Sequence, residues 1–194
     1  MDTQTLIKLR DLTGAGMLDC KKALDETNGD IEEAIDYLRK KGDVKAAKKT
    51  AERNAGEGII HSYIHAGGKV GVLLQINCET DFVARNEEFK NLAHSLAMHI
   101  AASSPLYVKP EDVPDEEIQR EKNVYREQLK TEGKKDEIID KIMAGKVKKY
   151  YEEVCLLEQP FIKDDKKIVK QAITEAIAKL GEKIEIVRFS RYQI

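Results

Sequence analysis

Tryptophan is absent from this 194-residue chain, and aromatic residues make up only 6% of it. The core is therefore expected to be mostly aliphatic. No apolar run approaches the length of about 18 residues that a membrane-spanning helix needs, so we expect no membrane contact. The first residues also lack the basic and then apolar pattern of a secretory signal peptide. These absences together predict a cytoplasmic protein.

An excess of charge of either sign is missing too. Charged residues make up 35% of the sequence, yet the formal net charge is only −2. Domains that bind nucleic acid usually carry a basic excess, which creates the field that attracts phosphates. The balanced composition therefore predicts a soluble protein with no direct nucleic-acid partner.

Recognisable catalytic and metal-binding motifs are also lacking. The glycines and lysines of residues 13–24 do not form a phosphate-binding loop, because no G-K-[ST] follows and the preceding segment is helical. The cysteines are far apart and are expected to be buried thiols, and the histidines have no metal-ligand spacing. We therefore expect no metal, no cofactor and no enzymatic activity; a nucleophile–base pair of Cys78 with a histidine is disfavoured. The residues concerned are Cys20, Cys78, Cys155, His61, His65, His94 and His99.

The first 42 residues predict a bundle of three short amphipathic helices. The first is capped by Thr3 and ends at Gly14, the second stops at Asn28-Gly29, and the third begins at Asp30 and ends at Gly42. So small a core gives limited stability, which favours a binding module over a catalytic scaffold. A lysine- and alanine-rich segment over 43–57 predicts a helical linker.

The rest of the chain, 58–194, predicts an α+β domain that also mediates dimerisation. Its sheet is expected to have three antiparallel strands: two form a hairpin around Gly67-Gly68, and the third is the C-terminal run KIEIVRFSRYQI. A protruding two-helix coiled-coil hairpin over 115–154 is inserted between further helices. These other helices are predicted over 86–103 and 165–180. Three strands and two helices make a thin core, so we expect another subunit to cover one sheet face.

The segment NCETDFVARNEEF, residues 77–89, permits two interpretations. In one, Phe82 packs beneath the turn between strand and helix and Asp81 caps that turn; residue type alone slightly favours this, because Phe is usually buried. In the other, both side chains are displayed at the tip of a rigid loop. An exposed aromatic there would serve as an anchor that inserts into a pocket of a partner protein.

Three blocks of the sequence resemble the elongation factor Ts family, in the family's order and over essentially the whole chain. They are LRDLTGAGMLDCKKAL (9–24), QINCETDFVAR (75–85) and KIMAGKVKKYYEEVCLLEQPFIKD (141–164). The resemblance implies a ubiquitin-associated-like bundle over 1–42. It also implies a non-enzymatic guanine nucleotide exchange factor that binds elongation factor Tu in its GDP-bound and nucleotide-free forms.

The resemblance assigns roles to two groups of residues. Thr80, Asp81, Phe82 and Val83 would dislodge Mg²⁺ from the partner's nucleotide site, which favours the displayed position of Phe82. A second group in the bundle would contact the GTPase's nucleotide-binding domain. It consists of Leu12, Thr13, Gly14, Ala15, Gly16, Met17 and Lys21.

The chain differs from the longer members of the family. Only one core subdomain can be placed, and the sequence stops at Tyr192-Gln193-Ile194 without a C-terminal helical module. This resembles the short members, which form homodimers. Two other classes of function remain as alternatives: an adaptor whose ubiquitin-associated-like bundle binds a ubiquitin-like or peptide ligand, and a cysteine or metal enzyme.

Overall fold

The computed structural model describes residues 3–194, and for residues 43–52 and Glu137 it describes the backbone alone. The protein is α+β, and its described residues form two compact units. Unit 1 comprises residues up to Ile60, Gln75–Ala93 and Gln171–Glu185; unit 2 comprises His61–Leu74, His94–Lys170 and Ile186–Ile194. The domain division at 42 and 57 stays a prediction.

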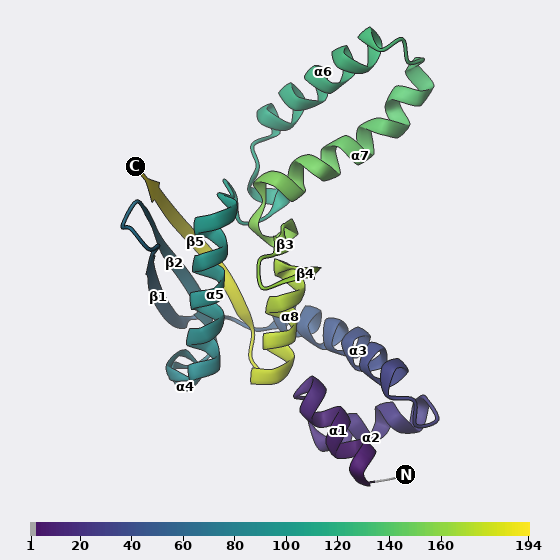
Figure 1. The fold of residues 1–194 in the computed structure, drawn as a ribbon, viewed down its shortest axis with the longest axis vertical. Coiled ribbons are helices and arrows are strands. Elements are labelled where there is room, and N and C mark those ends of the chain that lie inside the picture. Colours follow the sequence, from purple (N-terminus) through teal and green to yellow (C-terminus); the bar gives the residue numbers. More distant parts are fainter. Residues whose placement is uncertain (1–2) are drawn as a thin grey trace. The chain divides into compact units, whose positions relative to one another are not determined.

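The N-terminal bundle consists of α1 (Thr3–Thr13), α2 (Met17–Glu26) and α3 (Ile31–Glu52) (Figure 1). The Asp30 carboxylate accepts a hydrogen bond from the backbone N–H of Glu33 at 2.9 Å, as expected at the start of a helix. The fully buried side chains of the bundle are small or aliphatic: Leu9, Cys20, Ala23, Leu24 and Ala34.

The predicted end of the third helix at Gly42 is wrong. Helix α3 passes through Gly42 and continues to Glu52. Glycine inside a helix costs only about 1 kcal/mol relative to alanine. The alanines and lysines that follow are strong helix formers, so they offset this local weakness.

The main sheet has the order β1-β2-β5, from β1 (Glu57–Ile64), β2 (Val70–Cys78) and β5 (Ile184–Gln193), and is antiparallel. Gly67 and Gly68 have φ of 90° and 70°, the left-handed conformations that a tight hairpin turn requires. Alternate residues of β2 are buried from Val72 to Cys78, as the pattern predicted. Helix α5 (Glu87–Ser103) lies across one face of this sheet (Figure 1).

The helix predicted over 165–180 begins later than expected. Helix α8 spans Val169–Leu180, whereas Asp164–Ile168 forms β4. Strand β4 pairs with β3 (Pro160–Phe161) in a second, two-stranded sheet. The run DDKK carries no apolar residue to hold a helix against a core, so the helix begins where the apolar stripe becomes continuous.

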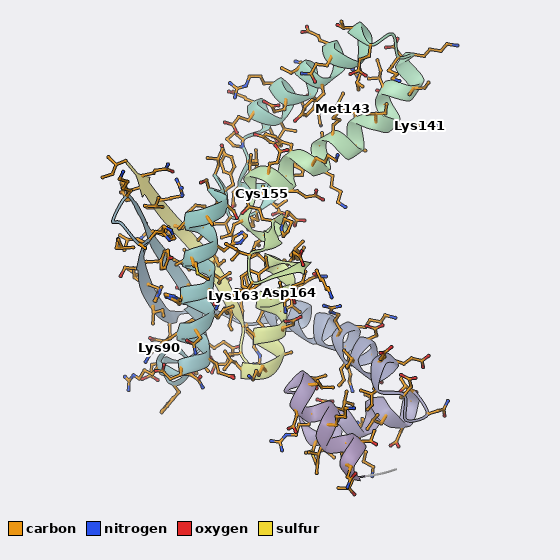
Figure 2. All side chains as sticks on the ribbon, viewed as in Figure 1. Lys90, Lys141, Met143, Cys155, Lys163 and Asp164 are labelled. Atoms are coloured by element: carbon orange, nitrogen blue, oxygen red, sulfur yellow. The ribbon has the colours of Figure 1, made fainter. Side chains whose placement is uncertain are left out.

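The predicted helical hairpin is present as α6 (Asp115–Thr131) and α7 (Asp136–Val154), which run side by side in Figure 1. Gly133 makes the turn with φ of 73°. Leu129 and Ile139 are buried along the predicted stripe, but Ile138 is exposed. Cys155, labelled in Figure 2, follows α7 directly and is buried at the base of the hairpin. Two 3₁₀ turns flank the hairpin, η1 (Pro110–Asp112) and η2 (Leu156–Glu158).

Candidate partner-binding site

The segment between β2 and α5 is a short helix and not the loop expected from sequence. Thr80 caps helix α4 (Asp81–Arg85), because its hydroxyl oxygen accepts a hydrogen bond from the N–H of Val83 at 3.4 Å. Thr80 therefore occupies the capping position that the sequence interpretation gave to Asp81. Asn86 ends the helix with an extended backbone, φ −66° and ψ 137°. The motif is thus held at both ends by defined backbone geometry.

Phe82 projects from this helix into solvent. Its side chain is 80% exposed, whereas Ala84 in the same helix is buried. The interpretation that places Phe82 beneath the turn is therefore wrong. Asp81 lies beside it and pairs with Arg85 at 2.9 Å, one helical turn on. An exposed large aromatic on a defined backbone is a feature typical of protein-binding surfaces.

Two carboxylates link the segment before α4 to the turn between α8 and β5, and the sequence interpretation missed both. Glu182, in the turn between α8 and β5, accepts hydrogen bonds from the backbone N–H groups of Glu79 and Thr80. Glu79 in turn accepts one from the N–H of Lys183. These residues lie more than a hundred positions apart in the chain. No signal in the sequence pointed to this arrangement, because the chain is rich in charged residues and nothing local distinguishes these two glutamates from those expected at the surface.

Cys78 is buried directly beneath the motif. Its thiol donates to the carbonyl oxygen of Thr80, with Sγ and O 3.2 Å apart. Burial, followed by the nearby Glu182 carboxylate, raises the pKa of the Cys78 thiol to about 11. At neutral pH the thiol is therefore protonated, and this is the opposite of an activated nucleophile. All three cysteines are buried, as expected.

The N-terminal residues that the resemblance singled out surround the connection between α1 and α2. Gly14 makes the turn with φ of 66°, and Thr13 donates its hydroxyl proton to the carbonyl of Leu9. Leu12 and Met17 are exposed, as are Gly14, Gly16 and Lys21, whereas Thr13 and Ala15 are half-buried. Leu18, which the sequence interpretation left out, is 78% exposed and extends this apolar surface. Its signal was an apolar residue lying off the buried stripe of α2.

A cavity of about 240 Å³ opens between α5 and α8 in unit 1, the unit that also carries α4. Lys179 and Glu88 form an ion pair across it. Lys179 also passes close to the bundle, because a β-carbon at Gly14 would lie 3.4 Å from its Cε. The cavity, the exposed bundle residues and α4 are therefore all features of one compact unit.

The histidines do not form a metal site within the described part of the chain. No three His, Cys, Asp or Glu side chains there are placed to hold a metal ion. Two rings do meet, with Nε2 of the half-buried His61 and Nδ1 of the exposed His94 3.3 Å apart. His99 is fully buried and bonds Gln159. Among the described helices, none is both long and apolar enough to span a bilayer.

An exposed aromatic on a braced helix and exposed apolar residues on a small bundle of the same compact unit are features typical of a protein that acts by binding another protein. The family model described as elongation factor TS matches residues 8–194. The chain belongs to the elongation factor Ts family, and both the adaptor and the enzyme alternatives are disfavoured.

Curated relatives match over nearly their whole length. The elongation factor Ts of Moorella thermoacetica is 58% identical over 186 residues, which are 96% of this chain and 91% of the relative. That of Thermosipho melanesiensis is 57% identical over 195 residues, 100% of this chain and 99% of the relative. That of Geobacter sulfurreducens is 55% identical over 185 residues, 95% and 85% of the two chains.

Proposed function

We propose that this protein is a guanine nucleotide exchange factor for elongation factor Tu in translation elongation. Membership of the elongation factor Ts family supports this function. The structural observation that carries the proposal is the 80% exposure of Phe82, the aromatic residue of the Thr80–Val83 motif. A side chain that serves as an anchor has to be accessible before the partner arrives.

Phe82 acts as a wedge in an apolar pocket of the partner. Mg²⁺ demands near-ideal octahedral geometry and is held by few protein ligands together with phosphate oxygens. A small displacement of the partner's helices therefore loosens both Mg²⁺ and the phosphates it bridges. Asp81 acts beside the wedge, where its carboxylate exchanges Arg85 for polar groups of the partner. GDP then leaves because its phosphate site is no longer complete.

The protein works without making or breaking a bond. If it weakens GDP binding to the partner, GDP weakens its own binding by the same factor, because the two ligands are linked on one protein. Typical coupling of this kind is 5–150-fold, or about 1–3 kcal/mol. The nucleotide concentrations in the cell then decide whether GTP or GDP rebinds.

The bundle supplies a second contact with the partner's nucleotide-binding domain. Leu12, Met17 and Leu18 give it an exposed apolar surface, and Lys21 adds a positive charge at its edge. Exposed apolar side chains that lie close together mark protein-binding surfaces. In this arrangement the bundle provides affinity, while α4 provides the displacement that releases nucleotide.

The protein is also proposed to be a homodimer that binds two GTPase molecules. Ile60, Ile64 and Leu73 are exposed on β1 and β2, with Ile60 at 70% and Ile64 at 66%. On β2, Leu73 faces away from the buried residues Val72 and Leu74. A second copy covering this face would remove the apolar surface from water. Light scattering at micromolar concentration should give a dimer mass, and a monomer mass would contradict this part of the proposal.

The function is tested by release of fluorescent GDP from elongation factor Tu, with and without this protein. Acceleration is expected, and it should weaken as free Mg²⁺ is raised. The Asp81→Ala/Phe82→Ala variant should bind yet release GDP slowly. If the wild-type protein does not accelerate release, the proposed function is wrong. If the wild-type protein accelerates release and the variant accelerates it equally, the wedge is wrong and the function stands.

A further inference from the structure

We propose that Glu182 and Glu79 are positioning residues that hold α4 in the orientation that displays Phe82. The two glutamates and the groups they bind are called the carboxylate clamp below. The inference deepens the proposed exchange function and rests on it for its effect on nucleotide release. The effect on the order of α4 is independent of any partner.

Glu182 binds the two residues before α4 with both carboxylate oxygens. Oε2 accepts from the N–H of Glu79 at 3.1 Å and from the N–H of Thr80 at 3.0 Å. Oε1 accepts from the Thr80 hydroxyl at 2.7 Å. Hydrogen bonds to an ionised acceptor are roughly twice as strong as neutral ones. One side chain from a distant turn therefore fixes the two residues that precede α4.

The Thr80 hydroxyl transmits this constraint into the helix. Its proton points toward Glu182, so its lone pairs are left to accept from the N–H of Val83. A hydroxyl can rotate freely unless a partner orients it. Glu182 thus sets the direction of the cap that begins the turn carrying Phe82.

Glu79 makes the reciprocal half of the clamp. Its carboxylate accepts from the N–H of Lys183 at 2.6 Å, next to Glu182 in the chain. Both of its oxygens also lie 3.2 Å from Nη1 of Arg53, which follows α3. Each of the two segments, the end of β2 and the turn after α8, thus contributes a glutamate that accepts from backbone N–H groups of the other. Arg53 connects Glu79 to the segment that leads from the bundle.

The clamp matters because α4 is very short and Ala84 is its one buried side chain. Five residues are far too few for a stable helix in isolation. Phe82 is displayed to solvent, so its ring adds no packing energy that would hold the helix in place. If the clamp is lost, α4 samples other conformations, and Phe82 is in position to act in a smaller fraction of the complexes that the bundle holds together. The maximum rate of GDP release falls in proportion to that fraction.

The first experiment measures the order of the wedge without a partner. The natural chain has no tryptophan, so Phe82→Trp places a single fluorescent reporter at the displayed position. The time-resolved anisotropy of this tryptophan reporter is compared with and without Glu182→Ala and Glu182→Gln. We expect a faster local decay in the alanine variant. The glutamine variant should be intermediate, because its one carbonyl oxygen can still accept from the two backbone N–H groups.

The second experiment measures GDP release from elongation factor Tu with chains that keep the natural Phe82. Glu182→Ala should lower the maximum rate by about tenfold, because the competent fraction falls, with partial rescue in Glu182→Gln. The concentration for half-maximal effect should change by less than about twofold, because the bundle contact is untouched. Glu175→Ala is the matched control: it removes an exposed carboxylate of α8 that pairs with Arg39 at 3.9 Å, outside the clamp. It should leave the maximum rate unchanged.

The two experiments separate the clamp from the function. A variant that is only unstable would lose activity in proportion to its unfolded fraction and would regain it on cooling. It would not show a lower maximum rate at an unchanged half-maximal concentration, nor the partial rescue by glutamine. Arg53→Ala breaks the outer arm without touching a buried group and should give a smaller loss of order. If the tryptophan reporter is as ordered in both Glu182 variants as in the chain that retains Glu182, the proposed role of the clamp is wrong. If wild type fails to release GDP, the proposed function is wrong.

Discussion

Two phenylalanines seven residues apart have opposite environments. Phe82 in α4 is 80% exposed, and Phe89 in α5 is fully buried. Seven residues are close to two helical turns, so in one continuous helix both rings would face the same side. They do not, because Asn86 interrupts the helix with an extended backbone. The difference shows that a single backbone break converts a core position into a displayed one.

Asn86 serves both helices at this break. Its N–H donates to the carbonyl of Val83 and closes α4. Its side-chain oxygen accepts from the N–H of Glu88 at 2.7 Å and caps α5. The two regions therefore share a residue but have different energetics: α5 is held by burial, and α4 by hydrogen bonds.

The largest effect is expected from the buried ring. Phe89→Ala should lower the free energy of unfolding by about 3–5 kcal/mol, because it leaves a cavity in the core. Phe82→Ala should change it by less than about 0.5 kcal/mol, because the ring is exposed. Denaturant titration of the two variants measures both values. Equal losses would show that the two rings have the same environment.

A pH effect should distinguish the buried face of α5 from the exposed α4. His99 is fully buried, and its Nδ1 accepts from the N–H of Ile162. Burial lowers the pKa of His99 below 6.5, with the Gln159 hydrogen bond opposing in part. The unfolded state thus binds the proton more readily, so stability is fully present above about pH 6.5 and falls as the pH drops.

The slope from this one group is at most about 1.4 kcal/mol per pH unit. His99→Asn should lose this part of the pH dependence of the unfolding free energy, while the part due to carboxylates remains. The measurement is the difference between the two unfolding free energies from about pH 7.5 to about pH 5.5, a range that brackets the ordinary pKa of histidine. A difference that does not change with pH would contradict the account of His99.

Removing the shared cap should make the two regions more alike. Asn86→Ala loses the side-chain cap of α5, which costs about 1 kcal/mol of stability. It also favours a continuous helix from α4 into α5, which would redirect Phe82. Asn86→Asp retains an acceptor and is the control. Unfolding measurements give the stability, and a slower GDP release in the alanine variant alone would support the role of the break.

The smallest effect is expected from the ion pair on α4. Asp81 and Arg85 are both substantially exposed, so water screens their attraction. Arg85→Ala should therefore change the unfolding free energy by less than about 0.5 kcal/mol. A loss above about 1 kcal/mol, the upper end for an exposed pair, would show that this pair, and not the carboxylate clamp, holds α4.

Much of the fold could be predicted from periodicity. The hairpin around Gly67-Gly68, the alternation along β2 and the ranges of α6 and α7 were all indicated by local patterns. The end of α3 was wrong because glycine was given too much weight at Gly42. Strand β4 was missed because Asp164–Ile168 is polar and pairs with only two residues.

The candidate site was predictable only in part. Residue type alone favoured a buried Phe82, and the family resemblance pointed to its display. No local pattern could reveal that Glu182 reaches Thr80, because the contact joins residues 102 positions apart. Contacts of this kind depend on how β5 returns beside β2, which is a property of the whole sheet.

The most direct test of the central claim is the maximum rate of GDP release from elongation factor Tu with Phe82→Ala. Tyr192→Ala is the matched control, because Tyr192 is an exposed aromatic outside α4. We predict that Phe82→Ala, folded and as stable as wild type, lowers the maximum rate by at least about tenfold, equivalent to about 1.4 kcal/mol in the barrier. Tyr192→Ala should leave it unchanged. A Phe82→Ala protein that releases GDP as fast as wild type would contradict the claim.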